Sequence, residues 1–536
     1  MYYHINSYLD IKTRDTKIIV DQRSVWIPGL TGCHSAFNKL VDQLLFAEAA
    51  NPGCCLRQAN AQLDPTNTIR KYKNLKCRVL LLPSSQCSHV ERSTPEILHL
   101  IARDLGSKAL YRLVSTSRRL HTVLQQSLYT NVTLCGIWSE DHTINIFLYA
   151  VTRTPRLASY VRSLKVNCWE PEKDNNGRSA QRVEFDDKLV HQLVAERTGY
   201  SEEEKLKWLK DLERHNSDAW LPLLIPQLKE LRKLDLTWPF GSHYVVDMLQ
   251  KAAIGTEPIF PRLEEAYAAW HDSENAFPSH YMDAFFKFPS MRKLGCYMLA
   301  ENEKDDDDEL EFEFESDDSE SPKGVILSPQ CSNITDIDLQ KSNAAEGMRE
   351  WVQACKELKS FRLVHGGGVV SWTDFQPRKI YESLAIQKST LESIWVEAYD
   401  GAYMDTDDEW MGSFVDFTAL RLICVSLPNL VGFDESKLPL RKLRDVLPSS
   451  LETLFLSLDE DESFEVAMDQ LAELAASESF PKLAAIYLEY YELRKPENAA
   501  RLEWLEQRCQ EASVFCFPHS SKGCIQQKQM MRVIWP

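Results

Sequence analysis

The chain lacks the sequence signatures of secretion and of membrane insertion. Its first residues, "MYYHINSYLDIKTRDTK", contain no apolar signal core. The longest apolar runs, such as Ile144–Val151, are far shorter than the roughly 20 residues that cross a bilayer. The 14 cysteines are scattered and form no C-x-x-C pair, which indicates free thiols in a reducing compartment. We therefore expect a protein of the cytoplasm, the nucleus or both, without a membrane partner.

Motifs of the common catalytic sites are also missing. The sequence has no H-E-x-x-H, no P-loop and no set of kinase motifs. "HGGG" at His365–Gly368 resembles the oxyanion loop of lipases and esterases, but the G-x-S-x-G nucleophile elbow of that chemistry is absent. The glycines directly follow the apolar pattern "LKSFRL", where a turn is expected. We predict a protein that is not an enzyme and needs no cofactor, with a hydrolase as a weak alternative.

Two sets of residues carry weak signals of ligand binding. Cys509, Cys516, His519 and Cys524 are of metal-ligating types, but their spacing fits no zinc module, so no metal site is predicted. The basic run "RKYKNLKCR" at Arg70–Arg78 is either a solvated surface or a nuclear-localisation or RNA-binding patch. Because basic residues form no larger cluster, we expect no nucleic-acid partner.

Negative charge is concentrated in one segment. The net charge is -18, and the stretch from Glu301 to Glu320 holds 13 acidic residues and one lysine. This density predicts a disordered insert at 301–322, outside any packed core. The insert is either a solvated loop or a docking strip for a basic partner. Serines that lie among the acidic residues are candidate phosphorylation sites: Ser316, Ser319 and Ser321.

A spaced apolar pattern recurs through most of the chain. L-x-x-L-x-L occurs ten times, and from Ile334 onward the copies lie 24 to 33 residues apart. The pattern is typical of the strand of a leucine-rich repeat, in which strand-plus-helix units stack on their neighbours. We expect the 70-residue gap to hold a degenerate repeat and a helical stretch at Glu202–Leu228, and the 43-residue gap to hold the acidic insert. The copies begin at Val161, Leu231, Leu263, Met291, Ile334, Leu358, Leu391, Leu420, Leu451 and Leu483.

Residues between the apolar positions of each copy are candidates for binding. Side chains alternate between the two faces of a strand, so these residues lie on the outer face of the sheet. Any of them can contact a partner, and the sequence does not rank them. Helices are expected between the strands, for example at Ala344–Leu358 and Phe464–Glu478. The candidate contact residues are Arg232, Lys233, Asp235, Glu392, Ser393 and Trp395.

The stretch from Ser93 predicts three short helices and a strand. We expect a first helix with Thr94 as its N-cap and Gly106 after its end, a second capped by Ser107, and a third capped by Ser115 or Ser117. A strand is expected next, at Asn131–Leu134. A unit of about 40 residues without a disulfide or a metal rarely folds alone. Its apolar faces are therefore expected to be covered by the rest of the chain or by another protein.

This stretch resembles an F-box. The matching segments are "PEIL", "LVSTSRRL" and "LYTNVTL", with Thr94 where the family has a leucine. The later repeats are similar to those of fungal F-box proteins with irregular leucine-rich repeats, particularly at Phe417–Val425 and Leu447–Leu456. The resemblance implies an α/β fold. A short three-helix F-box would precede an irregular leucine-rich-repeat solenoid with parallel strands and helices on the outer side.

The resemblance also implies a function. The chain would be the substrate-recognition subunit of a Skp-cullin-F-box ubiquitin ligase, with the F-box on a Skp-type adaptor of a cullin-RING ligase and the repeats on a protein substrate. A leucine-rich-repeat scaffold outside ubiquitination is the alternative. The implied domains are an extension or gene-model artefact at 1–92, the F-box at 93–134, repeats at 135–500, and a cap and tail at 501–536. The implied adaptor-binding residues are Pro95, Glu96, Ile97, Leu98, Ile101, Leu110, Val114 and Leu120.

Overall fold

A computed structural model gives the fold of most of the chain from Ser93 onward. The described residues divide into two compact units, one before and one after the boundary between Tyr129 and Thr130. The described residues are 93–135, 143–167, 169, 186–197, 199–214, 216–255, 259–301, 325–367, 370, 374–397, 409–436, 438–458, 464–490 and 495–519.

The first unit contains three helices that share a small core. They are α4 (Pro95–Arg103), α5 (Ser107–Val114) and α6 (Arg118–Thr130), as the sequence predicts. Apolar residues at helical spacing bring one face of each helix together. The expectation that the rest of the chain or another protein must cover these faces is therefore only partly right, because the unit buries part of its own apolar surface. The core residues are Leu98, Ala102, Leu110, Val114, Leu120 and Leu124.

The ends of these helices differ in part from the expectation. Thr94 occupies the N-cap position of α4, but its side chain makes no capping hydrogen bond. Gly106, rather than Ser107, is the N-cap of α5. Ser117 is a side-chain cap as expected, because its Oγ accepts a hydrogen bond from the backbone N–H of Leu120 at 3.2 Å.

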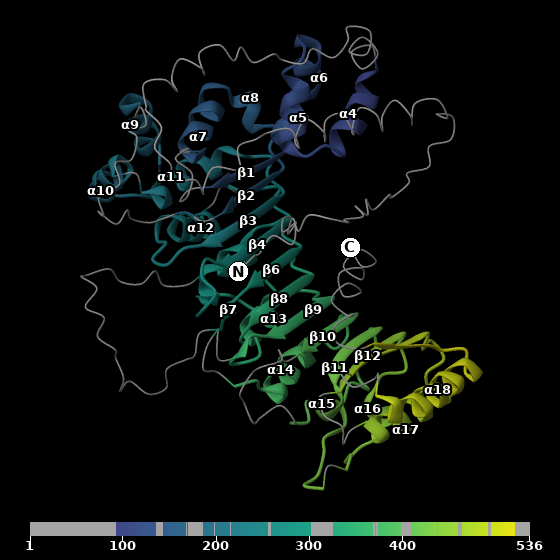
Figure 1. Ribbon diagram of the computed structural model, residues 1–536. Coiled ribbons are helices and arrows are strands. Elements are labelled where there is room, and N and C mark those ends of the chain that lie inside the picture. The colour runs from purple at the N-terminus through teal and green to yellow at the C-terminus, as the bar shows by residue number, and fades with distance from the viewer. Residues whose placement is uncertain are drawn as a thin grey trace, which may run out of the picture. The chain divides into compact units, whose positions relative to one another are not determined.

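The second unit is built on one long parallel sheet (Figure 1). Each strand pairs with the strand that follows it, except that β5 and β7 form a separate pair. The strands of the long sheet are β1 (Asn131–Cys135), β2 (Ser163–Asn167), β3 (Lys233–Trp238), β4 (Glu265–Trp270), β6 (Lys293–Tyr297), β8 (Asp336–Ser342), β9 (Ser360–His365), β10 (Ser393–Glu397), β11 (Leu422–Ser426), β12 (Thr453–Leu458), β13 (Ala485–Tyr490) and β14 (Phe515–His519). The separate pair is β5 (Phe277–Pro278) and β7 (Leu299–Ala300).

Helices connect these strands and pack against one another in chain order. Contacts join α11 to α12, α13 to α14, and α17 to α18. Parallel strands need such crossover connections, and the strand-plus-helix unit is the repeating element. The α-helices of this unit are α7 (Thr143–Arg153), α8 (Pro155–Ala158), α9 (Asp187–Ala195), α10 (Glu202–Glu213), α11 (Ser217–Leu224), α12 (Tyr244–Ile254), α13 (Arg349–Ala354), α14 (Pro377–Leu384), α15 (Leu427–Val431), α16 (Leu443–Val446), α17 (Phe464–Ala475) and α18 (Pro496–Glu511). Short 3-10 helices lie at Ile225–Gln227, Ser279–Tyr281, Asp283–Lys287 and Ala385–Gln387.

All ten strands predicted from L-x-x-L-x-L are present, as is the strand expected at Asn131–Leu134. The alternation in each copy buries its apolar residues on one side, as in β3, where Leu234, Leu236 and Trp238 are buried. Strand β14 was not predicted. Strand β1 begins before the predicted repeat range 135–500 and β14 lies beyond it, and the two strands extend the sheet at its two ends.

Two expectations about the connections are wrong. Strand β2 pairs directly with β3, so no strand of a hidden repeat from the 70-residue gap stands between them in the sheet. The other part of that expectation, a helical stretch at Glu202–Leu228, is confirmed as α10, α11 and the 3-10 helix Ile225–Gln227. The helix expected at Ala344–Leu358 is shorter, because Gly347 and Met348 have φ angles of 69° and 57° and α13 begins only at Arg349. The helix predicted at Phe464–Glu478 is confirmed as α17, and the acidic insert lies in the connection between β7 and β8.

The last repeat closes with a defined helix end. After α18, Ser513 has a φ of 63°. The N–H of Val514 donates to the carbonyl of Cys509 at 2.8 Å, and the N–H of Ser513 donates to that of Gln510 at 3.0 Å. This pair of bonds is the Schellman motif, which satisfies carbonyls at the end of a helix and turns the chain. The turn directs the chain straight into β14.

Candidate functional site

A single row of side chains crosses the long sheet on the side opposite to its buried leucines. Every residue of this row stands in register with its neighbour on the next strand. Strand alternation places all of them on the same face of the sheet, which we call the open face. Three members of the row, Trp395, Cys424 and Phe455, are nevertheless buried there, together with Leu422 of the same face. We call the whole set the central row. Its members are Thr133, Lys165, Asp235, Tyr267, Gly295, Asp338, Arg362, Trp395, Cys424, Phe455, Tyr487 and Phe517.

The first half of the central row is polar and internally paired. Lys165 Nζ lies 3.0 Å from Asp235 Oδ2, and Arg362 Nε lies 3.9 Å from Asp338 Oδ1. Beside the row, Lys233 Nζ lies 4.1 Å from the centre of the Tyr267 ring. Partly exposed ion pairs of this kind contribute only about 0–1 kcal/mol to stability. This half therefore presents neighbouring positive and negative side chains, and neither sign of charge dominates it.

The second half of the central row is aromatic. Arg362 lies over the Trp395 ring, 4.8 Å from its centre, at the junction of the two halves. The ring centres of Trp395 and Phe455 are 5.0 Å apart, across the small side chain of Cys424. Tyr487 stacks on Phe455 at 4.3 Å and on Phe517 at 4.8 Å. We call Trp395, Phe455, Tyr487 and Phe517 the aromatic row.

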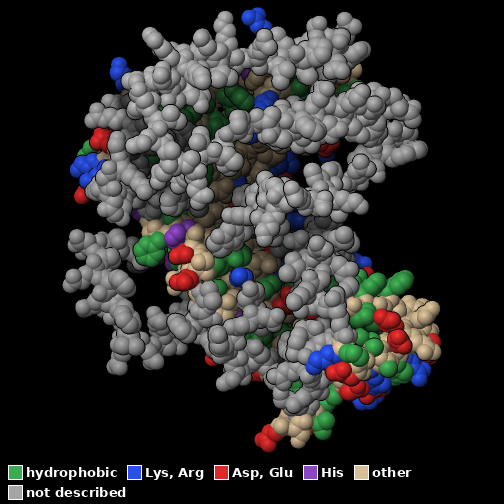
Figure 2. Space-filling view, viewed as in Figure 1, with side chains coloured by type: hydrophobic (Ala, Val, Ile, Leu, Met, Phe, Trp, Pro, Cys, Tyr) green, Lys and Arg blue, Asp and Glu red, His purple; other side chains and the backbone are tan. Residues whose placement is uncertain are grey.

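The aromatic row becomes more exposed toward the end of the sheet. Trp395 and Phe455 are buried, whereas Phe517 is 37% exposed and the neighbouring Phe515 on the same strand is 69% exposed. Figure 2 shows hydrophobic side chains among charged ones in the region where Figure 1 labels β12, α17 and α18. Aromatic residues are enriched in the cores of protein–protein interfaces and among the residues that dominate binding. The end of the open face therefore has the chemistry of a protein-binding surface.

The contact residues predicted from sequence lie on or beside this face. Asp235 and Trp395 belong to the central row, and Lys233 and Ser393 begin their strands two positions earlier. Arg232 and Glu392 directly precede their strands and pair with charged neighbours: Arg232 with Glu264 at 3.2 Å, and Glu392 with Lys359 at 3.4 Å.

Sequence reasoning missed the aromatic row beyond Trp395. Its signal was nevertheless present, because Trp395, Phe455 and Tyr487 each occupy the fifth position of an L-x-x-L-x-L copy. Comparing that position from copy to copy reveals the change from charged to aromatic residues. Phe517 has no such signal, since β14 lacks the pattern.

The residues predicted to bind an adaptor divide into two groups. Those that form the core of the three-helix unit are Leu98, Leu110, Val114 and Leu120, which support the fold and offer no contact surface. Pro95, Glu96 and Ile97 are exposed, and Ile101 is half-buried.

Two exposed apolar residues of this unit were not predicted. Leu100 is 51% exposed and Tyr111 is 63% exposed, compared with 43% for Ile97. Large apolar side chains left in water on short helices are candidates for a partner contact. Because Ile97 and Leu100 both lie on α4, they offer the more compact target for substitution.

The "HGGG" segment forms a turn, as the repeat pattern predicts. A Cβ on Gly366 would lie 2.3 Å from Val370 Cγ2 and 2.8 Å from the Lys341 carbonyl oxygen, so only glycine fits there. Gly367 has a φ of 65°, and Gly368 lies outside the described residues. His365 is buried at the end of β9, and burial lowers its pKa to about 4. Gly366 and Gly367 are thus explained by the packing and the conformation of the backbone.

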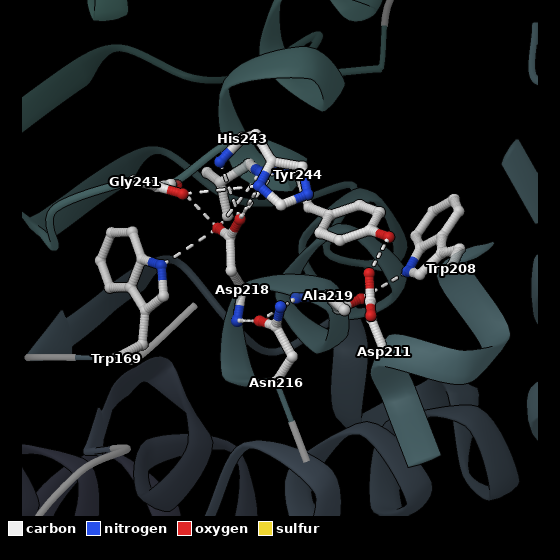
Figure 3. Close-up of polar contacts among 11 residues, drawn as sticks. Trp169, Trp208, Asp211, Asn216, Asp218, Ala219, Gly241, His243 and Tyr244 are labelled. Carbon is white, nitrogen blue, oxygen red and sulfur yellow. Dashed lines mark hydrogen bonds and ion pairs between the residues drawn. The ribbon is translucent and has the colours of Figure 1, made fainter. Parts of the chain in front are cut away.

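A buried carboxylate in the first turn of α11, that of Asp218, accepts several hydrogen bonds (Figure 3). Asp218 accepts hydrogen bonds from Ser242 Oγ at 2.7 Å and Trp169 Nε1 at 3.1 Å. The backbone N–H groups of His243 and Tyr244 donate to it at 2.9 and 2.8 Å. These N–H groups belong to the start of α12, so Asp218 caps that helix from a distant part of the chain. With its lone pairs used in this way, Asp218 is structural.

The remaining predictions concern metals, membranes and the charged segments. No group of three or more metal-ligating side chains occurs in the described part of the chain, and the His519 side chain and Cys524 lie outside it. Within the same residues, no helix is long and apolar enough to span a bilayer. The basic run Arg70–Arg78 lies outside the described residues. So does the acidic insert beyond Glu301, including Ser316, Ser319 and Ser321.

Comparison with known proteins agrees with this geometry. Residues 327–526 match the family model of a leucine-rich repeat domain, which covers the strands from β8 to β14. A search of curated proteins found no match to the chain. The chain therefore carries a leucine-rich repeat domain at 327–526, and a domain of this kind favours interaction with other proteins. The aromatic row lies entirely within the matched range.

Proposed function

We propose that the chain is a substrate-recognition subunit of a Skp-cullin-F-box type ubiquitin ligase. The open face of the repeats binds the protein substrate, and the three-helix unit, within an F-box at 93–134, docks on a Skp-type adaptor. Through that adaptor the chain joins a cullin-RING ligase in the cytoplasm or the nucleus. The bond chemistry belongs to other subunits, and this chain contributes proximity.

The aromatic row carries the substrate-binding part of the proposal. Side chains that only shape a repeat fold need not be aromatic on the open face, because the fold is held by the buried leucines on the other side. Here four large rings stand in line, from the buried Trp395 to the last ring, Phe517, which is 37% exposed on the edge strand β14. Rigid rings bury much area at a low entropic cost, which suits them to anchor a partner.

The adaptor-docking part rests on the resemblance to an F-box and on the exposed apolar residues of α4 and α5. The three helices bury a core of their own, so their fold does not require Ile97, Leu100 or Tyr111 to be apolar. Burying one such side chain in an interface stabilises a complex by about 1.5–3 kcal/mol. Thr94, where the family has a leucine, removes one such contact.

Comparative affinity capture tests the substrate-binding face. The full chain, Tyr487→Ala and Phe517→Asp would each be used to capture proteins from cells in which proteasome activity is blocked. The matched control is Phe240→Asp, which also replaces an exposed phenylalanine but lies after β3. We expect the same proteins to be lost with both row variants and retained by the control, while the adaptor stays bound to all four chains. Equal capture by wild type and row variants would contradict the assignment of this face.

A leucine-rich-repeat scaffold outside ubiquitination is the alternative. It predicts that the aromatic-row variants lose their partners in the same way, whereas the wild-type chain does not bind a Skp-type adaptor. Blocking the proteasome would then leave the amount of captured partner unchanged. Two measurements thus separate the ligase subunit from the scaffold. They are binding of the adaptor and the change in the amount of captured partner when the proteasome is blocked.

A further inference from the structure

Two cysteines face each other inside the last repeat. Cys509 lies in the final turn of α18 and is fully buried, and Cys516 lies on β14 and is half-buried. Cys516 stands in register with the buried Ile486, so it belongs to the side of the sheet that packs against helices. Contacts between α18 and β14 bring the two elements together.

The two thiols are in direct contact and are not joined. Both cysteines are free, and their side chains share a hydrogen bond. This bond lowers the pKa of the Cys509 thiol, while the same bond and burial raise the pKa of the Cys516 thiol. Sharing one proton in this way favours a thiolate on one sulfur beside a thiol on the other.

The connection between the two cysteines is short and fixed. The Schellman bonds at Ser513 and Val514 hold the end of α18 against the start of β14. The backbone therefore already holds the sulfurs within hydrogen-bonding reach, and bond formation requires only a further approach of the side chains.

We propose that Cys509 and Cys516 are a modification site, an oxidisable dithiol that low-molecular-weight disulfides such as glutathione disulfide convert into an intrachain disulfide. The half-buried Cys516 thiol passes its proton to the neighbouring Cys509 thiolate and attacks the disulfide of the reagent, which releases one glutathione thiolate and leaves a mixed disulfide on Cys516. The Cys509 thiolate then attacks the Cys516 sulfur and releases the second glutathione thiolate. Two protein sulfurs are oxidised, one reagent disulfide is reduced, and the one proton that the pair shared goes to the solvent.

Oxidation at this site would affect the open face, because the cross-linked strand β14 also carries residues of that face. Strand β14 carries Phe517, the last ring of the aromatic row, and the exposed Phe515. A cross-link between α18 and β14 ties that strand to its helix and restricts opening of the terminal repeat. Terminal repeats have only one neighbour, so local opening begins there more easily than in the middle of an array.

A single proteolytic peptide reports the predicted bond. Trypsin cleaves after Arg508 and Lys522, and the resulting peptide, "CQEASVFCFPHSSK", contains Cys509 and Cys516 and no other cysteine. The folded full chain would be treated with glutathione disulfide, blocked with an alkylating reagent and digested without reduction. We expect this peptide to lose the mass of two hydrogen atoms and to carry neither alkyl group nor glutathione. The buried Cys296 and Cys355 should stay reduced and be alkylated only after unfolding.

Matched variants and a stability measurement complete the test. In Cys516→Ser the peptide should no longer lose the mass of two hydrogen atoms. Cys509→Ala should give a stable glutathione adduct on Cys516. Oxidised wild type should unfold at a temperature several degrees higher than reduced wild type, and the variants should show no such shift. A wild-type peptide that stays fully alkylated, or that stops at the glutathione adduct, would overturn the proposal. Because the wild-type peptide gives a result by itself, the proposal stays testable if a variant fails to fold.

Discussion

The rings of Phe455 and Tyr487 stack on neighbouring strands with 4.3 Å between their centres and 9° between their planes. These two residues are paired in the register of β12 and β13, so the sheet itself sets the spacing of the stack. Trp395 and Phe517 extend the contact on either side. A parallel sheet with one residue of each strand in line can thus build a rigid aromatic surface from residues far apart in the sequence.

A double-mutant cycle measures the strength of this stack. Phe455→Leu and Tyr487→Leu keep an apolar side chain in place but remove the ring contact. We expect a coupling of about 0.5–1.5 kcal/mol in the free energy of unfolding, as for other aromatic pairs. Chemical denaturation of the wild type, both single variants and the double variant gives the value. Strict additivity would mean that the rings stack without stabilising the repeat.

Removing the buried carboxylate of Asp218 should be among the most destabilising single changes in the second unit. Asp218→Ala leaves the Trp169, Ser242 and α12 backbone donors buried without an acceptor, at a cost of about 3 kcal/mol. Asp235→Ala is the matched control, because its ion pair with Lys165 is partly exposed and should matter by less than about 1 kcal/mol. Equal midpoints of thermal unfolding for the two variants would contradict the capping role.

Much of the fold, and one part of the site, could be predicted from the sequence. Ten strands could be predicted from L-x-x-L-x-L, because each strand must bury apolar residues at the same positions against its neighbours. Asp218 gives no such signal, since the helix that it caps begins at Tyr244 and the contact exists only after folding. The outer helices also escape prediction where one backbone angle decides their start, as at Met348.

For the candidate site, the sequence predicted which face of the sheet carries it but not which residues come together there. Trp395 was among the predicted contacts, but the ring that it contacts, Phe455, lies 60 residues further along the chain. The register of the strands brings Phe455 into line with Trp395, and Tyr487 beside Phe455. In the three-helix unit, helical spacing identified the apolar residues but did not separate the buried Leu98 from the exposed Leu100.

His365 should make the protein less stable in mild acid. Its pKa is about 4 in the folded chain and 6.5 in the unfolded chain, because burial disfavours the charged imidazolium. The unfolded state therefore binds more protons between these values, and the free energy of unfolding falls as the pH drops from 6.5 toward 4, by about 3 kcal/mol at most. His365→Leu should remove this part of the pH dependence. The exposed His191→Gln serves as control and should leave the slope unchanged.

Asp283 should act in the opposite direction. Burial raises its pKa from 3.8 to about 7, and its carboxyl accepts a hydrogen bond from Trp351 Nε1 at 2.9 Å. The stability that goes with the protonated form is fully present below pH 3.8 and is lost as the pH rises through 7, by up to about 4 kcal/mol. Asp283→Asn keeps the acceptor and loses the charge, so its gain over wild type should grow from pH 4 to pH 8 in urea unfolding.

The exposed Asp272→Asn is the matched control for Asp283 and should show no such trend. A gain for Asp283→Asn that is the same at every pH would indicate better packing instead of a shifted pKa. Because His365 and Asp283 change stability in opposite directions between pH 4 and 6.5, the wild type should show a shallower slope there than either variant. Both titrations are needed to separate the two groups.

Adaptor binding tests the central claim most directly. Isothermal titration of a purified Skp-type adaptor into the full chain would be compared with titration into the double variant Ile97→Asp, Leu100→Asp. Leu206→Asp, at an exposed leucine of α10, is the matched control. The account predicts that wild type and control bind alike and that the double variant binds roughly 100-fold more weakly or not at all, because two buried apolar contacts are lost. A folded wild-type chain that does not bind the adaptor, or a double variant that binds it as tightly as the control, would contradict the claim.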